Sequence, residues 1–129
     1  MKQKDVKVLV VDDEVAFAST LAQRLKMRGF SAATANDGEE ALLRLNEDLP
    51  DVVVLDLRMP GMHGMDVLKE IKKGYPHIQV IILTGHGNDG DAEEARRLGG
   101  FDFLNKPTDI DHLELRIRRA FQDRLASTI

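Results

Sequence analysis

The chain has 129 residues, of which 43% are hydrophobic, and this length most simply forms one domain with a substantial core. The mild net charge of −4, without a basic stripe, argues against a nucleic-acid surface, and the absence of cysteine excludes disulfides and thiolate metal sites. A polar start at Met1–Asp5 and short apolar runs predict no signal peptide and no membrane span, so we expect a cytoplasmic protein.

Apolar runs alternate with helical patterns five times along the chain. A strand is predicted at 7–11, and the helix after it keeps apolar residues at helical spacing as far as Leu25 and ends at Gly29. A weaker strand at 31–35 precedes a helix for which Asp37 is the candidate N-cap.

The second half of the chain continues this alternation. Its predicted segments are a strand at 52–57, a helix after Pro60-Gly61, a strand at 80–83, a glycine-rich loop at 85–90, a short helix capped by Asp91, a strand at 103–105 and a last helix over 110–121. Strands alternating with helices predict an α/β fold, with right-handed crossovers and a parallel sheet covered on both faces. We expect a single domain over residues 1–129.

Polar side chains stand where the predicted strands end. Asp12 and Asp13 follow the first apolar run, Asp56 the third, Thr84 the fourth and Lys106 the fifth. The carboxyl ends of parallel strands meet in one crevice, and three carboxylates there repel one another unless a cation joins them. An all-oxygen set suits Mg²⁺ or Mn²⁺. Each residue alone would be an ordinary cap, strand residue or solvated charge, but the combination predicts phosphoryl chemistry with a nucleophilic carboxylate.

Four segments resemble the receiver domains of two-component response regulators. They are Val10–Glu14, Leu55–Gly64, Leu83–Gly87 and Asp102–Pro107, and their order and spacing cover essentially the whole chain. The resemblance implies a flavodoxin-like (βα)5 fold, a doubly wound parallel five-stranded sheet with strand order 2-1-3-4-5.

The resemblance also implies roles for the acids. Asp56 would be the phosphoacceptor and would share a Mg²⁺ ion with Asp13, which binds directly, and Asp12, which binds largely through water. The backbone carbonyl of Arg58 would complete the metal ligands of the protein. The function implied is a phosphoacceptor switch, not an independent enzyme, because the domain catalyses only its own phosphorylation and dephosphorylation.

Other positions match the switching and tuning residues of the family. Thr84 would move toward the phosphoryl oxygens, Lys106 would pair with them, and Phe103 would be the switch aromatic or, alternatively, a plain core residue. Arg58 and His86, each two residues after a site residue, would tune the lifetime of the phosphoryl group. For His86 the alternative is a solvated loop residue.

The implied partners are a sensor histidine kinase or phosphotransfer protein. The implied output surface comprises the helix after Asp91, strand 103–105 and the helix over 110–121, which could also form a homodimer. The chain is either a stand-alone receiver or the N-terminal regulatory piece of a longer regulator, such as a transcriptional one. The cognate kinase, stimulus and output are not encoded in any motif.

Three other readings compete with this one. A pseudo-receiver that only binds proteins is disfavoured by the complete set of site residues. A haloacid-dehalogenase-type phosphatase needs a second acid two residues after the nucleophile, where Arg58 stands. A flavin carrier needs a phosphate-cradling loop after the first strand, where the acidic Asp12–Glu14 would repel the flavin phosphate.

Overall fold

The computed structural model describes residues 5–85 and 87–127, in which five strands alternate with five helices. The strands are β1 (Lys7–Val11), β2 (Ser31–Ala35), β3 (Val52–Leu55), β4 (Gln79–Thr84) and β5 (Asp102–Asn105). The helices are α1 (Val15–Met27), α2 (Gly38–Glu47), α3 (Gly64–Gly74), α4 (Asp89–Arg97) and α5 (Ile110–Ser127). The alternation predicted from the sequence is confirmed.

All strand pairs are parallel, and the order across the sheet is β2-β1-β3-β4-β5. The strands at the centre are apolar on both faces, as in β3, where all four residues are buried. The chain runs outward from β1 to β2 and then crosses back to β3. The carboxyl ends of β1 and β3 therefore flank the point where the winding direction reverses, which is where ligands bind in folds of this kind.

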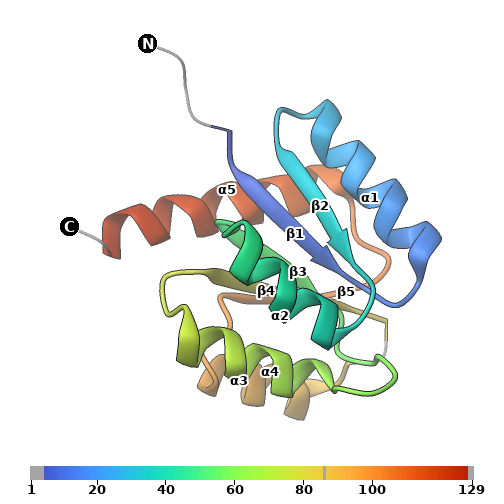
Figure 1. Ribbon diagram of the computed structural model, residues 1–129, viewed down its shortest axis with the longest axis vertical. Helices are drawn as coiled ribbons and strands as arrows, with labels where there is room; N and C mark the ends of the chain where they lie inside the picture. The colour runs from blue at the N-terminus through green and yellow to red at the C-terminus, as the bar shows by residue number, and fades with distance from the viewer. Residues whose placement is uncertain (1–4, 86, 128–129) are drawn as a thin grey trace.

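Helices cover both faces of the sheet (Figure 1). The face toward α1 and α5 is packed by one set of strand residues, which includes Val8, Val10, Val54 and Ile81. The face toward α2, α3 and α4 is packed by the alternate set, which includes Leu9, Val11, Val53 and Ile82. The helices leave the carboxyl edge of the sheet to loops. Within the described ranges, no helix is long and apolar enough to cross a membrane.

Several element ends agree with the sequence prediction, and others do not. The helix before Gly29 ends where expected, and Asp37 caps α2 by accepting a 2.8 Å hydrogen bond from the amide three residues on. The predicted cap of α4 is wrong: Asn88 is the N-cap, and its side chain accepts a 2.9 Å bond from the amide of Asp91. The Asp91 carboxylate accepts in turn from the amide of Asn88, which completes a capping box.

The strand expected at 52–57 also ends early, at Leu55. The amide of Asp56 still donates to the carbonyl of Val11 at 2.9 Å. The chain then turns, and the carbonyl of Leu57 accepts from the amide of Gly64 at 2.9 Å instead of from a strand. Asp56 therefore stands at the end of β3, immediately before this turn.

Candidate functional site

Three carboxylates meet at the carboxyl ends of β1 and β3. Asp12 and Asp13 follow β1, and Asp56 follows β3. One carboxylate oxygen from each of the three lies within 4.8 Å of the other two. Asp12 and Asp56 are buried, with only 2% and 4% of their surface exposed. The predicted gathering of these acids is confirmed.

One oxygen of the buried Asp56 carboxylate lacks the hydrogen bond that a buried acid normally has. Its Oδ1 atom is buried and has no hydrogen-bond partner among the described residues. Its Oδ2 atom lies 3.9 Å from Lys106 Nζ, beyond hydrogen-bond distance. A buried acceptor without a donor is costly, so native structures rarely keep one without a functional reason. An oxygen-only site with an unpartnered buried oxygen fits a hard divalent cation such as Mg²⁺.

Asp12 is held from two sides. Its Oδ1 accepts a 2.9 Å bond from the amide of Glu14, and its Oδ2 accepts a 2.7 Å bond from Lys106 Nζ. Burial raises the pKa of the Asp12 carboxyl above its ordinary value, and the bond from Lys106 only partly opposes this effect.

Lys106 follows β5 and lies among the acids, as predicted. Its amide donates to the carbonyl of Thr84 at 2.9 Å, which fixes the end of β5 to the end of β4. Burial lowers the pKa of the Lys106 ammonium, but the bond to Asp12 and the charges of Asp12 and Asp56 outweigh burial, so the pKa is raised. Lys106 therefore stays positively charged at neutral pH and offsets part of the acidic charge.

The start of α3 packs directly on the backbone of Asp56. A Cβ atom added at Gly64 would lie 2.4 Å from the Asp56 carbonyl oxygen and 2.6 Å from Leu57 Cα. Any side chain at this position would push the phosphoacceptor candidate out of place. His63 caps the helix, because its Nδ1 atom accepts from the amide of Met65 at 3.2 Å.

Thr84 and Phe103 meet at the loop after β4. A Cβ atom added at Gly87 would lie 2.4 Å from Phe103 Cζ and 3.0 Å from Thr84 Cγ2, so both side chains pack against this glycine. Thr84 is fully buried, and the Phe103 ring is partly buried against the core on the α3 side. Sequence reasoning did not foresee the role of Gly87, because the contact joins β4 and β5 through tertiary packing alone.

Two predicted positions, Arg58 and His86, remain. Arg58 lies on the loop after β3 and is exposed. The roles of its backbone carbonyl as a metal ligand and of its side chain in tuning stay predictions. His86 lies outside the described residues.

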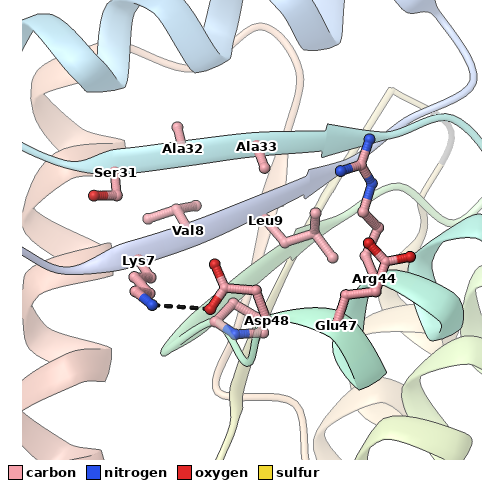
Figure 2. A pocket seen from close by; sticks show the side chains of 10 residues that line it. Lys7, Val8, Leu9, Ser31, Ala32, Ala33, Arg44, Glu47 and Asp48 are labelled. Atoms are coloured by element: carbon pink, nitrogen blue, oxygen red, sulfur yellow. Dashed lines mark hydrogen bonds and ion pairs between the residues drawn. The ribbon is translucent and has the colours of Figure 1, made fainter.

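A hollow of about 220 Å³ lies between β1, β2 and α2 (Figure 2). It follows the amino-terminal halves of β1 and β2 and exists because β2 supplies only small side chains, Ser31, Ala32 and Ala33, beside α2. Its walls carry charges of both signs, and Lys7 pairs with Asp48 at 2.9 Å. Asp12 and Asp56 are not among its lining residues, so the acidic site is a separate place.

Residues 8–118 match the model of the response regulator receiver domain family. This chain belongs to that family. It is a receiver domain with the phosphoacceptor architecture, and the resemblance seen in the sequence is confirmed.

Two relatives of this chain are transcriptional regulators. The chain is 41% identical over 128 residues to the transcriptional regulatory protein GlrR of Escherichia coli (strain K12), which covers 99% of this chain and 29% of GlrR. It is 41% identical over 113 residues to the DNA-binding transcriptional regulator NtrC of Salmonella typhimurium, which covers 88% of this chain and 24% of NtrC. The chain thus spans less than a third of the length of these regulators.

Solved structures agree with this assignment. A receiver domain from Clostridium thermocellum superposes with a TM-score of 0.88 at 38% identity, over 94% of this chain and 98% of that one. NtrX from Brucella abortus in complex with ADP matches with a TM-score of 0.91 at 36% identity, over 97% of this chain and 29% of that one. The five-stranded fold predicted from the sequence is therefore shared with receiver structures.

Proposed function

We propose that Asp56 accepts a phosphoryl group from a phosphohistidine on a sensor histidine kinase or phosphotransfer protein. The observation that carries this proposal is the buried Asp56 carboxylate, whose Oδ1 atom has no hydrogen-bond partner among the described residues. A buried oxygen without a hydrogen bond raises the energy of the unmodified acid, and a modified acid in the same crevice would gain contacts.

The residues of the crevice fit a Mg²⁺ ion, and Mn²⁺ would suit the same oxygens. Asp12, Asp13 and Asp56 would hold it with their carboxylates, and the backbone carbonyl of Arg58 would complete the protein ligands. When bound, the ion supplies positive charge to the acids and to the phosphoryl oxygens.

The chain itself positions the groups that react. A carboxylate oxygen of Asp56 forms a bond to phosphorus while the phosphorus–nitrogen bond of the donor breaks, and the electron pair of that bond stays on the imidazole. Lys106, already 3.9 Å from Asp56 Oδ2, would pair with the new phosphoryl oxygens. Thr84 would supply a hydroxyl donor to the same oxygens. Phe103, which packs with Thr84 against Gly87, would transmit the movement of Thr84 to β5.

The proposed output surface is the one that the resemblance to the family implies. The surface formed by α4, β5 and α5 would switch on phosphorylation and could serve for homodimerisation. We expect residues 1–129 to be one receiver domain, either alone or at the N-terminus of a longer regulator, and in the cytoplasm. DNA binding would belong to an output domain, as the names of the longer relatives suggest. The receiver would catalyse only its own phosphorylation and dephosphorylation.

Intact mass after incubation with acetyl phosphate and Mg²⁺ tests this function. The wild type should gain one phosphoryl group, and Asp56→Asn should gain none. Absence of an adduct in the wild type with any donor would instead favour a pseudo-receiver that only binds proteins. Gel filtration of the same samples would show whether phosphorylation changes the oligomeric state.

Arg58 offers a test of phosphoryl lifetime. Its exposed side chain, two residues after Asp56, can limit water access to the aspartyl phosphate, so Arg58→Ala should change the half-life of the adduct. Arg119→Ala, an exposed arginine on α5, is the matched control. An unchanged half-life in Arg58→Ala would remove this role.

A further inference from the structure

The ammonium group of Lys106 is held by the start of α1 more closely than by the phosphoacceptor candidate. Besides its 2.7 Å bond to Asp12, Nζ lies 3.3 Å from Glu14 Oε1 and 4.2 Å from the centre of the Phe17 ring. Its distance to Asp56 Oδ2 is 3.9 Å. Glu14 and Phe17 both belong to the segment that opens α1, and neither is among the predicted metal ligands.

These contacts compete with the role proposed for Lys106. An ammonium has three hydrogen-bond donors, and two of them are used here by Asp12 and Glu14. A phosphoryl group on Asp56 would add acceptor oxygens close to Nζ, which already lies 3.9 Å from Asp56 Oδ2. One donor remains, so Lys106 can give more than one hydrogen bond to those oxygens only if it gives up its bond to Asp12 or to Glu14. Of the two acids that bind Lys106, Glu14 is the more easily released, because its side chain is exposed and makes no cap hydrogen bond to α1.

We propose that Glu14 and Phe17 are positioning residues, which hold Lys106 in a resting place at the start of α1 until Asp56 is phosphorylated. Phosphorylation then draws Lys106 away and frees the start of α1. This inference rests on the proposed function, in which Lys106 pairs with the phosphoryl oxygens. It adds α1 to the elements that register the state of Asp56.

The size of the effect follows from the exposure of the contacts. The Glu14 carboxylate is 67% exposed, so its attraction for Lys106 is weakened by solvent. Exposed ion pairs and cation–ring contacts are typically weak, which corresponds to a change of about two- to fivefold in rate when one is removed. Removing either contact should make Lys106 more available, so phosphorylation of Asp56 should become faster by that factor.

Three substitutions separate the effect of the contacts with Lys106 from the effect of the overall charge of the protein. Glu14→Gln removes the charge, whereas Glu14→Asp keeps the charge on a side chain too short to reach Lys106 in the same way. Phe17→Leu keeps apolar bulk but removes the ring face. Glu39→Gln, an exposed acid in the first turn of α2, is the control for loss of one negative charge elsewhere.

The first readout is the rate constant for phosphorylation by acetyl phosphate at saturating Mg²⁺. We expect Glu14→Gln, Glu14→Asp and Phe17→Leu to react about two- to fivefold faster than the wild type, and Glu39→Gln to react like it. If Glu14→Asp reacts at the wild-type rate, the proposed role of the contact between Glu14 and Lys106 is overturned, even if Glu14→Gln reacts faster. If the wild type itself is not phosphorylated, the proposed function fails instead.

The second readout does not depend on turnover. In the unphosphorylated protein, the NMR signal of the Lys106 ammonium should shift in the two Glu14 variants and in Phe17→Leu, and stay unchanged in Glu39→Gln. Phosphorylation of the wild type should shift both this signal and the amide of Val15. An unchanged Lys106 signal in the Glu14 and Phe17 variants would overturn the inference.

Discussion

Asp56→Asn should make the metal-free protein more stable, although it removes the residue proposed to carry the function. The Asp56 carboxylate is 4% exposed and lies within 4.8 Å of oxygens of Asp12 and Asp13. At an effective dielectric constant of about 20, each acid repels it by about 3.5 kcal/mol, and Lys106 at 3.9 Å attracts it by about 4 kcal/mol. The net repulsion of about 3 kcal/mol is reduced by solvent around Asp13. We therefore expect a gain of about 1 to 2 kcal/mol.

Asp51 provides the matched control, because it is an equally buried acid whose partners are all in place. It is 3% exposed, accepts a 2.9 Å bond from the amide of Lys7 and pairs with Arg124 at 3.1 Å. Asp51→Asn weakens both contacts and should cost about 2 kcal/mol. The same chemical change is thus expected to have opposite signs at two buried positions.

Urea unfolding followed by far-ultraviolet circular dichroism measures both effects. In EDTA, Asp56→Asn should unfold at higher urea than the wild type, and Asp51→Asn at lower urea. Mg²⁺ at ten times its dissociation constant should stabilise the wild type by about 1.4 kcal/mol and Asp56→Asn by less. If Asp56→Asn is destabilised in EDTA as much as Asp51→Asn, the acids do not repel one another as described.

Three further substitutions test other parts of the fold. Gly64→Ala should cost about 2 to 3 kcal/mol and slow phosphorylation, because its Cβ would meet backbone at 2.4 Å; an unchanged urea midpoint would contradict this. Gly87→Ala should displace the Phe103 ring, seen as shifted aromatic NMR signals, and unshifted signals would show that the ring does not pack there. The guanidinium of Arg28 and, after it, that of Arg118 lower the pKa of the Glu114 carboxyl. Glu114→Gln should therefore lower the free energy of unfolding by about 0.5 to 1 kcal/mol above pH 4.5. This cost should shrink as the pH falls through the lowered pKa, and a pH-independent cost would exclude the ion pairs as its source.

Local sequence pattern was sufficient for the elements and for the meeting of the acids. The four residues of β3 are all buried and apolar because helices cover both faces of the sheet. The end of this apolar run therefore marks the edge of the sheet at which the site lies. Parallel strands bring their carboxyl ends together, which places Asp56 beside Asp12. The strand order came from resemblance to receiver domains and is confirmed.

Some contacts between distant segments were not predictable. Lys106 was predicted to lie among the acids, but its hydrogen bond to Glu14, which is 92 positions away in the sequence, follows from no spacing rule. Asn88 and Asp91 are both suitable caps, and only the reciprocal bonds of the folded chain show which one begins α4.

The site of phosphorylation is the most direct test of the proposed function. Borohydride reduces an aspartyl phosphate to homoserine, so reduction of the protein after acetyl phosphate treatment, followed by peptide mass spectrometry, locates the modified residue. We predict homoserine at position 56 alone, with the yield dependent on Mg²⁺. Homoserine at Asp12, Asp13 or another acid, with position 56 unmodified, would contradict the assignment of Asp56 as the phosphoacceptor.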